Sequence, residues 1–311
     1  MQPDDVLLVT GGSGLVGANL VAHLRQAGFT KVVAPRQEDC DFTDRKATLD
    51  FFAAARPVYV FHMAGYVRGI MGNMRHQAEA WLNNTLINTH VVEASHKAGV
   101  KKIVAMGTVA MYPDPLPSNP LREDTIWQGA PHGSEYGYAQ AKRGMLAQLQ
   151  VYNDSYGLDY ACVLSTNLYG PHDRFDIETG HVVPSLIKKF YDAKQGGGTV
   201  TVWGDGSAQR DFIYVKDAAR ALQLIMDKVS GTVNLATGVT RRIREAVDIL
   251  AAHTGLQDRV VWDSSKPNGQ LFRAYDVSRL QQAGFACQST LEQALAETYD
   301  WYAANALTAR H

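Results

Sequence analysis

Three side chains of this sequence have the types and the spacing that a proton transfer to a carbonyl requires. Tyr138 and Lys142 stand four residues apart, so on a helix they share one face. A nearby ammonium stabilises tyrosinate and lowers the pKa of the phenol, which lets tyrosine exchange a proton near neutral pH. Thr108 lies about thirty residues earlier, just after an expected strand, where its hydroxyl can donate to the same carbonyl oxygen. This trio predicts the proton half of a ketone–alcohol redox reaction.

A glycine-rich segment near the first residues predicts a dinucleotide site. Gly11, Gly14 and Gly17 follow the apolar run 6–10 and precede an apolar-periodic stretch, which is the order strand, turn, helix. Such a turn lets the backbone approach a pyrophosphate, whose charge is offset by N–H groups and by the helix dipole. A glycine turn that binds no ligand is the alternative interpretation of this spacing.

The residues after the second expected strand bear on the choice of cofactor. NAD enzymes commonly carry an acidic residue there for the ribose 2′-hydroxyl, whereas this chain has Arg36, which suits a 2′-phosphate. NADPH is therefore favoured over NADH, with Glu38 and Asp39 as the acidic alternative if the turn is longer. Asp41 stands where a carboxylate can hydrogen-bond the adenine amine. Asp44 either shares that role or only caps the next helix.

Strands that alternate with helices must position these residues. Buried strands are expected at 6–10, 31–34, 58–62, 102–106, 159–164 and 199–203. Helices are expected at 14–27, 44–55, 75–98, 136–156, 182–193, 215–229, 241–254 and 290–304. This alternation predicts an α/β fold, with a Rossmann-type doubly wound parallel sheet and a smaller C-terminal α/β substrate lobe.

The same pattern suggests how the chain divides. We expect an NADP-binding domain at 1–170, with 211–240 returning to it, and a substrate-binding lobe at 171–210 and 241–311. The segment 111–131 contains five prolines and is expected to form a long ordered loop that faces the substrate.

Composition excludes several classes of function. A formal net charge of -1 over 311 residues provides no global field for nucleic acid or for an anionic membrane. The first residues lack the features of a signal peptide, and no apolar run approaches the roughly 18 residues that span a bilayer, so we expect a cytoplasmic protein. The three cysteines, Cys40, Cys162 and Cys287, are widely spaced, which predicts neither a disulfide framework nor a metal site.

Taken together, the motifs resemble the extended short-chain dehydrogenase/reductase family, also called the NAD-dependent epimerase/dehydratase family, over almost the whole length. The segments that carry the resemblance are 11–17, 112–113, 138–142, 166–171, 181–184, 202–206, 210–213 and 266–269. They are most similar to the branch that epimerises and then reduces GDP-4-keto-6-deoxy sugars with NADPH. The resemblance also implies a homodimer, in which the helices 75–98 and 136–156 of each subunit form a four-helix bundle.

The resemblance implies roles for single residues. Thr108 replaces the family's serine, Tyr138 is the proton donor, and Lys142 orients the nicotinamide ribose. Cofactor contacts are expected at Gly11, Gly14, Leu15, Val16, Gly17, Arg36, Asp41, Ala64 and Lys142. Contacts with the nucleotide diphosphate-sugar are expected at Asn167, His181, Val182, Lys189, Trp203, Arg210 and Arg273.

One position departs from that branch. The branch has a cysteine two residues after the catalytic serine position, and this cysteine works with a histidine to invert C3 and C5. Here the position is Ala110, while the histidine is kept as His181. Inversion beside a ketone needs a base on one face of the enolate and an acid on the other, whereas reduction needs only a hydride and the Tyr138 proton. Cys162 is interpreted as packing on a buried strand, and His181 either binds the sugar or moves a proton alone.

The sequence therefore predicts an NADPH-dependent C4-reductase of a GDP-linked 4-keto-6-deoxy sugar, hexose or heptose, that acts without C3/C5 epimerisation in surface polysaccharide synthesis. The first alternative is a bifunctional 3,5-epimerase/4-reductase in which His181 works with an unrecognised acid. The second is a non-catalytic dinucleotide sensor, which the presence of Tyr138 and Lys142 disfavours. Val109 and Ala110 leave no acid for dehydration, and Arg36 disfavours a 4-epimerase with tightly bound NAD.

Overall fold

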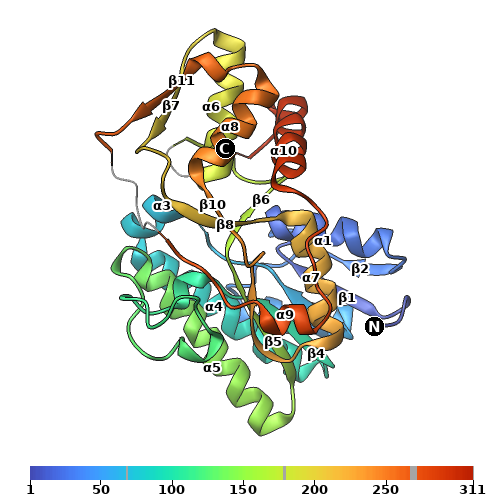
Figure 1. The fold of residues 1–311 in the computed structure, drawn as a ribbon. Coiled ribbons are helices and arrows are strands. Elements are labelled where there is room, and N and C mark those ends of the chain that lie inside the picture. Colours follow the sequence, from blue (N-terminus) through green and yellow to red (C-terminus); the bar gives the residue numbers. More distant parts are fainter. Residues whose placement is uncertain (68, 178–179, 267–271, 311) are drawn as a thin grey trace.

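Six parallel strands form the main sheet of the protein (Figure 1). The computed structural model describes residues 1–67, 69–177, 180–266 and 272–310. In spatial order the strands are β2 (Lys31–Val33), β1 (Val6–Thr10), β3 (Tyr59–His62), β4 (Lys102–Met106), β5 (Asp159–Ser165) and β9 (Gly231–Leu235). The central strands are almost wholly buried, as expected for a parallel sheet that helices cover on both faces. The predicted doubly wound α/β fold is confirmed.

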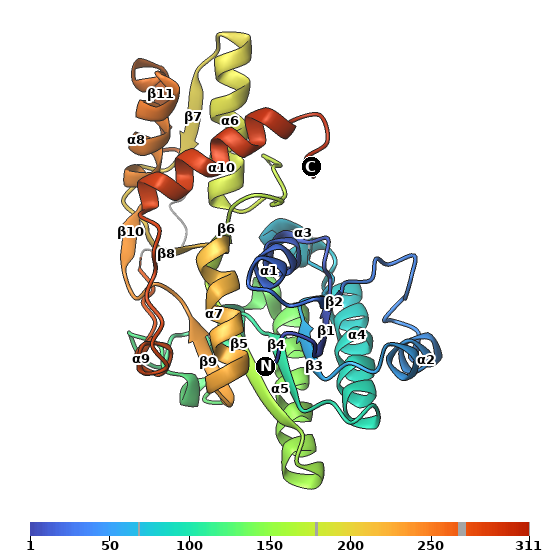
Figure 2. The same cartoon turned by 90° about the vertical axis from the view of Figure 1, so that its right-hand side faces the viewer.

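Helices cover the two faces of this sheet in separate layers (Figures 1 and 2). One layer contains α2 (Arg45–Ala55), α4 (Gln77–Lys97) and α5 (Tyr136–Tyr156), and the other contains α1 (Leu15–Gln26) and α7 (Val215–Lys228). Successive strand residues alternate between the layers, so that Leu8 packs with the first and Leu7 and Val9 pack with the second. This alternation explains why the strands appear in the sequence as continuous apolar runs.

A smaller part of the molecule has its own core (Figure 2). It contains α6 (Val182–Gly196), α8 (Ile243–Thr254), α10 (Leu291–Asn305) and a two-stranded parallel sheet of β7 (Val200–Trp203) and β11 (Val260–Asp263). The strand expected at 199–203 therefore exists, but it lies outside the main sheet. The expectation that it is fully buried is wrong, because its residues alternate between buried and exposed.

A third sheet lies between the two parts. Its strands are β10 (Thr240–Arg242), β8 (Gln209–Tyr214) and β6 (Asn167–Tyr169). The division into 1–170 with 211–240, and 171–210 with 241–311, stays a prediction. Within the second range, the short helix α9 (Ser278–Gln282) contributes Leu280 to the core beside α7 and the main sheet. No helix among the described residues is both long and apolar enough to cross a bilayer.

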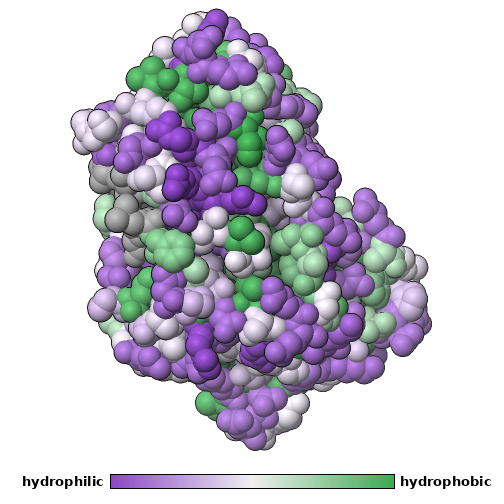
Figure 3. Space-filling model, viewed as in Figure 1, coloured by the Kyte–Doolittle hydropathy of each residue, from purple (hydrophilic) through white to green (hydrophobic). Residues whose placement is uncertain are grey.

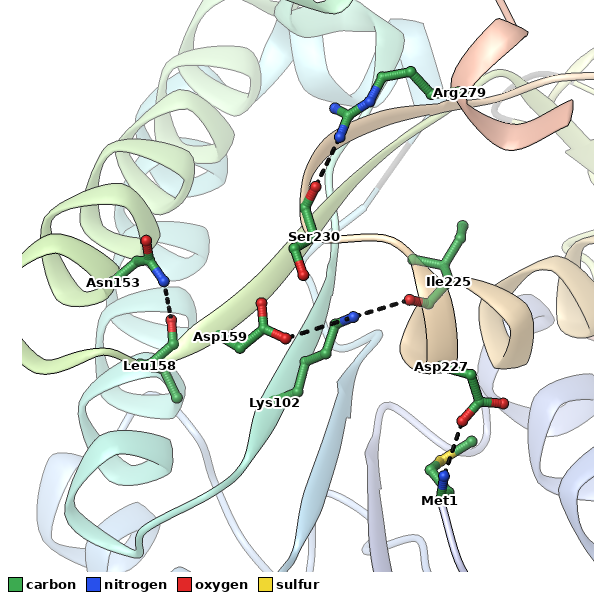
Figure 4. Close-up of polar contacts among 9 residues, drawn as sticks. All are labelled: Met1, Lys102, Asn153, Leu158, Asp159, Ile225, Asp227, Ser230 and Arg279. Carbon is green, nitrogen blue, oxygen red and sulfur yellow. Dashed lines mark hydrogen bonds and ion pairs between the residues drawn. The ribbon is translucent and has the colours of Figure 1, made fainter. Parts of the chain in front are cut away.

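The amino ends of the strands are fixed by polar contacts (Figure 4). The buried Lys102, at the start of β4, donates from Nζ to the Ile225 carbonyl at 3.1 Å and lies 3.7 Å from Asp159 Oδ2. Arg279 donates to the Ser230 carbonyl at 2.8 Å, just before β9. These contacts hold α7 and α9 against the sheet, and they leave its opposite, carboxyl edge for ligands.

The face in Figure 3 is mostly hydrophilic, and hydrophobic residues appear on it only in small groups. Exposed large apolar side chains on α4 and α5 include Trp81, Leu82 and Val151. Because single exposed apolar residues are normal, these side chains bear on assembly only through their occurrence on two helices that pack together.

Candidate active site

The glycine turn lies at the carboxyl ends of β1 and β3, where the strand order of the sheet reverses. Gly11 has φ +68, and a Cβ built on it would lie 2.7 Å from the Ala64 backbone nitrogen. A Cβ on Gly17 would lie 2.1 Å from the Gly11 carbonyl oxygen. Both positions therefore require glycine, because the turn packs tightly against the end of β3 and against itself.

These features fit the pyrophosphate of a dinucleotide. The turn closes with the Gly14 N–H donating to the Gly11 carbonyl at 3.0 Å, and α1 begins directly after it. Leu15 and Val16 occupy the first turn of α1, which contains no acidic residue that would compete with a phosphate for the helix dipole. Six of the predicted cofactor residues thus meet at one place, and they are Gly11, Gly14, Leu15, Val16, Gly17 and Ala64.

The residues that follow β2 are exposed and engaged with each other. The Arg36 guanidinium lies 3.4 Å from a Glu38 carboxylate oxygen, and Asp39 Oδ2 accepts from the Arg36 backbone N–H at 2.8 Å. Asp41 accepts from the Thr43 N–H at 2.9 Å in a local turn. The capping interpretation of Asp44 is confirmed, because its side chain accepts from the first turn of α2.

The predicted catalytic trio of Thr108, Tyr138 and Lys142 comes from the end of β4 and the start of α5. Thr108 immediately follows β4 and begins the one-turn helix Val109–Met111, while Tyr138 and Lys142 lie in the first turns of α5. Lys142 is 2% exposed, and its Nζ donates to the Met106 carbonyl at 2.8 Å. A Cβ on Gly65 would lie 3.6 Å from the same Nζ, so the ammonium also faces the segment that follows β3.

Burial shifts the pKa of both titrating members of the trio. It lowers the pKa of Lys142 to about 8. It raises the pKa of Tyr138, and the Glu135 carboxylate raises that pKa further. The prediction that a nearby cation lowers the phenol pKa is wrong for this structure, because desolvation is the dominant effect. A phenol held in its protonated form is nevertheless the form that can donate a proton to a carbonyl.

Glu135 is a site residue that the sequence interpretation missed. It ends the one-turn helix Gly133–Glu135 before α5, and it accepts a hydrogen bond from Asn73 Nδ2 at 3.2 Å. Its carboxylate acts on the pKa of His181 as well as on that of Tyr138. The available signal was its position three residues before Tyr138, which places it at the start of the same helix.

His181 precedes α6, and Val182 is the first residue of that helix, with both side chains exposed. Although His181 is accessible to water, protein surrounds it closely enough that burial lowers its pKa, and Glu135 only partly opposes this effect. A neutral imidazole at pH 7 follows from this direction. The side chain is then available as a hydrogen-bond donor and acceptor for a sugar hydroxyl.

Two arginines of the predicted substrate set lie close together. Burial lowers the pKa of Arg210, and the neighbouring Arg273 lowers it further. Arg273 Nε is buried without a hydrogen-bond partner among the described residues. Adjacent guanidinium groups with an unused donor fit a diphosphate. Asn167 is placed differently, because its amide donates to the Asp211 carbonyl of β8 at 3.1 Å.

Lys189 and Trp203 form a separate polar–aromatic surface in the smaller part. Lys189 Nζ lies 5.5 Å from the Trp203 ring centre and donates to the Thr201 carbonyl at 2.9 Å. Trp203 is 61% exposed, which leaves its ring available for stacking. Of the motif 266–269, residues 267–269 lie outside the described residues.

The structure also describes Ala110, the position where the branch that this chain resembles has a cysteine. Ala110 lies in the one-turn helix Val109–Met111, and its N–H donates to the Thr108 hydroxyl at 3.2 Å. Cys162 on β5 is 0% exposed, and burial raises its pKa to about 12. The interpretation of Cys162 as a packing residue is confirmed.

Comparison with known proteins identifies the family of this chain. Residues 7–236 match the model of the family described as "NAD dependent epimerase/dehydratase family". Probable GDP-L-fucose synthase 1 of Oryza sativa subsp. japonica is 37% identical over 308 residues, which cover 98% of this chain and 94% of that protein.

Two solved structures have the same fold over nearly the whole chain. The GDP-L-fucose synthetase from Naegleria fowleri bound to NADP has a TM-score of 0.93 at 32% identity, covering 100% of this chain and 96% of that one. MlghC, the GDP-mannoheptose C4 reductase from Campylobacter jejuni with NADP bound, has a TM-score of 0.87 at 26% identity, covering 97% and 99%. The predicted use of a nicotinamide dinucleotide agrees with both. This chain belongs to the NAD-dependent epimerase/dehydratase family.

Proposed function

We propose that this enzyme is an NADPH-dependent C4-reductase of a GDP-linked 4-keto-6-deoxy sugar, hexose or heptose, and that it leaves C3 and C5 unchanged. The observation that carries the proposal is Ala110, a methyl group beside Thr108 where inversion requires an acid or a base. The relatives support the substrate class, since their names describe enzymes of GDP-sugars, and MlghC is named as a C4 reductase.

The side chains of the trio divide the work of reduction. NADPH, when bound, supplies the hydride for C4. Tyr138 donates its proton to the C4 oxygen. We assign to the Lys142 ammonium, which lies one turn further along the same helix, the role of offsetting the charge of the tyrosinate that remains. Thr108 donates a hydrogen bond to the same oxygen. The carbonyl thus gains one hydride and one proton, and Tyr138 recovers its proton from solvent.

The rest of the site suits a nucleotide diphosphate-sugar. Arg210 and the unused Nε of Arg273 hold the diphosphate as a cationic pair. Trp203 provides an exposed ring for the base, with Lys189 beside it. His181 binds the sugar as a neutral imidazole. Surface polysaccharide synthesis is the process that such a product would supply.

A second candidate, the bifunctional 3,5-epimerase/4-reductase, is favoured by one observation. Glu135 is an ionisable group near both His181 and Tyr138, so it is a candidate for the acid that inversion requires. We place the reductase first because Asn73 holds Glu135 at the start of α5, three residues before Tyr138, whereas the missing cysteine belongs to the turn that contains Ala110.

Incubation of the GDP-linked 4-keto-6-deoxy sugar with enzyme and NADPH in D2O separates these candidates. The reductase consumes NADPH and gives a product without deuterium at C3 or C5. Deuterium at either carbon contradicts it, and loss of that deuterium in Glu135→Gln, but not in the surface control Glu79→Gln, establishes the bifunctional enzyme. No NADPH consumption with keto sugars of either configuration contradicts both and leaves the dinucleotide sensor.

A further inference from the structure

The segment that follows α10 places an arginine over the glycine turn. A Cβ built on Gly14 would lie only 3.8 Å from Nη1 of Arg310. Gly14 is the residue before α1, so this guanidinium lies beside the N-terminal end of that helix. Sequence reasoning could not find this contact, because Arg310 is separated from the turn by almost the whole chain.

The backbone around Arg310 is held on both sides. Arg310 pairs with Arg174 in an isolated parallel bridge, and the Phe175 N–H donates to the Arg310 carbonyl at 2.8 Å. The Phe175 ring stacks on Tyr302 of α10 with centres 4.3 Å apart. Asn19 of α1 donates to the Pro171 carbonyl at 2.9 Å, so the segment 171–175 connects α1 with α10. Arg310 is therefore positioned by tertiary contacts.

The charges in this region do not balance. Among the ion pairs of the described residues, none includes Arg174 or Arg310. Arg174 Nε is also buried without a hydrogen-bond partner among these residues. Although the Arg310 side chain is exposed to water, partial burial lowers its pKa, Arg174 lowers it further, and Asp173 opposes the shift. Burial raises the pKa of Asp173 to about 7, so this neighbouring carboxyl is only a partial counter-charge near neutral pH. Two adjacent guanidinium groups in such surroundings favour a bound anion.

The glycine turn next to Arg310 indicates which anion would bind there. The glycine turn and the start of α1 present backbone N–H groups at the same place, and such a turn between a strand and a helix is where a dinucleotide's pyrophosphate binds. We propose that Arg310, with Arg174 beside it, binds the pyrophosphate of the dinucleotide, so that the cofactor is held between the glycine turn and the segment that follows α10. The inference rests on the proposed use of NADPH and adds a binding group from the far end of the sequence.

This arrangement makes the smaller part contribute to cofactor binding. Arg310 follows a helix whose core residues, such as Leu295 and Tyr302, belong to the smaller part. A dinucleotide held on both sides would connect the α1 surface with that core. Cofactor binding is then expected to stabilise the packing between the main sheet and the smaller part.

Equilibrium titrations without any sugar test the proposal. The dissociation constants of NADPH and NADH are measured by fluorescence for the wild type, Arg310→Gln and Arg174→Gln. We expect Arg310→Gln to weaken both ligands by a similar factor of about ten or more, because both carry the pyrophosphate. Arg174→Gln should weaken both less. The dissociation constant of GDP should stay within about twofold in every variant, since Arg310 is assigned to the cofactor.

Three controls distinguish a specific loss of cofactor binding from a general effect of the substitution on charge or folding. Arg25→Gln removes the same charge at the other end of α1 and should leave binding unchanged. Arg310→Lys keeps the charge and should recover part of the affinity. The increase in melting temperature on adding NADP should shrink in Arg310→Gln, while the melting temperature without ligand stays close to that of the wild type.

Three outcomes would overturn the inference. The first is an unchanged affinity for both dinucleotides in Arg310→Gln. The second is a loss confined to NADPH, which would assign Arg310 to the 2′-phosphate, and the third is a loss confined to GDP. A wild type that binds neither dinucleotide contradicts the proposed function as well. A wild type that binds both but reduces no keto sugar contradicts only the proposed function.

Discussion

At the scale of single residues, the buried charge that the proposed chemistry needs lowers the free energy of unfolding. Lys142 carries a charge while only 2% exposed, with one hydrogen bond to the Met106 carbonyl. Its pKa falls from 10.5 to about 8, which means that the folded state holds this proton less tightly than the unfolded chain does. Below about pH 8, the buried ammonium therefore lowers the free energy of unfolding.

Lys142→Met should make the cofactor-free protein more stable and inactive. We expect the free energy of unfolding at pH 7 to rise by about 1–3 kcal/mol, since the methionine needs no desolvation of a charge. The gain should shrink as pH rises from about 8 toward 10.5, where the unfolded lysine also loses its proton. Urea titrations at pH 7 and at pH 10 measure this difference. A variant that is less stable at pH 7, or equally changed at both pH values, would contradict the explanation.

Tyr138→Phe should remove the proton donor without disturbing the cofactor. We expect kcat/KM for the 4-keto sugar to fall about 10²–10⁴-fold, the usual contribution of a positioned general acid. The dissociation constant of NADPH should stay within about twofold, because the phenol is assigned to the sugar carbonyl. Tyr136→Phe, which removes an exposed hydroxyl on the same helix, is the matched control. Equal losses in both variants would argue against Tyr138 as the donor.

Sequence reasoning found those site residues that belong to local patterns. The glycine turn, Thr108, Tyr138 and Lys142 each follow a strand or lie on one helix, so spacing alone brings them together. Glu135 and Arg310 were missed for different reasons. Glu135 stands outside the spacing of the tyrosine and the lysine, and Arg310 reaches Gly14 only through tertiary packing. The direction of the Tyr138 pKa shift was also missed, because burial cannot be deduced from two neighbouring residue types.

At the scale of elements, the glycines of the turn have separate tasks. Gly17→Ala should destabilise the protein by about 1–3 kcal/mol, because its Cβ would lie 2.1 Å from the Gly11 carbonyl oxygen. In Gly14→Ala the Cβ would lie 3.4 Å from the same oxygen, an ordinary contact, so the protein should keep its stability. That methyl group would nevertheless occupy space that the pyrophosphate needs. NADPH should therefore bind at least about tenfold more weakly to Gly14→Ala.

Thermal unfolding and NADPH titration of the two variants measure this separation. Gly17→Ala should lower the melting temperature before any ligand is added, whereas Gly14→Ala should lose only the increase that NADP produces. If Gly14→Ala unfolds as early as Gly17→Ala, the two glycines share one structural task and the distinction fails.

The accuracy of the predicted elements follows the clarity of their sequence pattern. The long helices α4 and α5 and the apolar strands β1, β4 and β5 agree with the expected ranges to within about two residues. The strands β6, β8, β9, β10 and β11 were not predicted. β6 and β10 have only three residues each, and β8 begins with polar residues, so these strands lack the continuous apolar run that marks β1 and β4.

At the scale of the whole molecule, the site depends on segments from both parts. The glycine turn and the trio belong to the part built on the main sheet, whereas His181 directly precedes α6, and Lys189 and Trp203 lie on α6 and β7. The proposed reduction therefore requires that the two parts hold their relative position while each binds its own ligand. The sheet of β6, β8 and β10 provides that connection, since Asn167 of β6 also bonds the backbone of β8.

We also propose that two chains assemble through α4 and α5. Trp81 and Leu82 on α4 are 48% and 50% exposed, and Val151 on the adjacent α5 is 58% exposed. Apolar side chains of this size on two packed helices favour burial against a second copy, which would complete a four-helix bundle. Leu82→Glu should then shift the protein from dimer to monomer, because dimerisation would bury an unpaired carboxylate.

Sedimentation velocity at micromolar concentration measures this change. Val261→Glu, which places the same charge at an exposed apolar position on β11 in the smaller part, should remain a dimer. Because the catalytic trio and the glycine turn lie within one chain, the monomeric Leu82→Glu variant should still bind NADPH. A wild type that sediments as a monomer, or a Leu82→Glu variant that stays dimeric, would show that the exposed apolar residues of α4 do not form the interface.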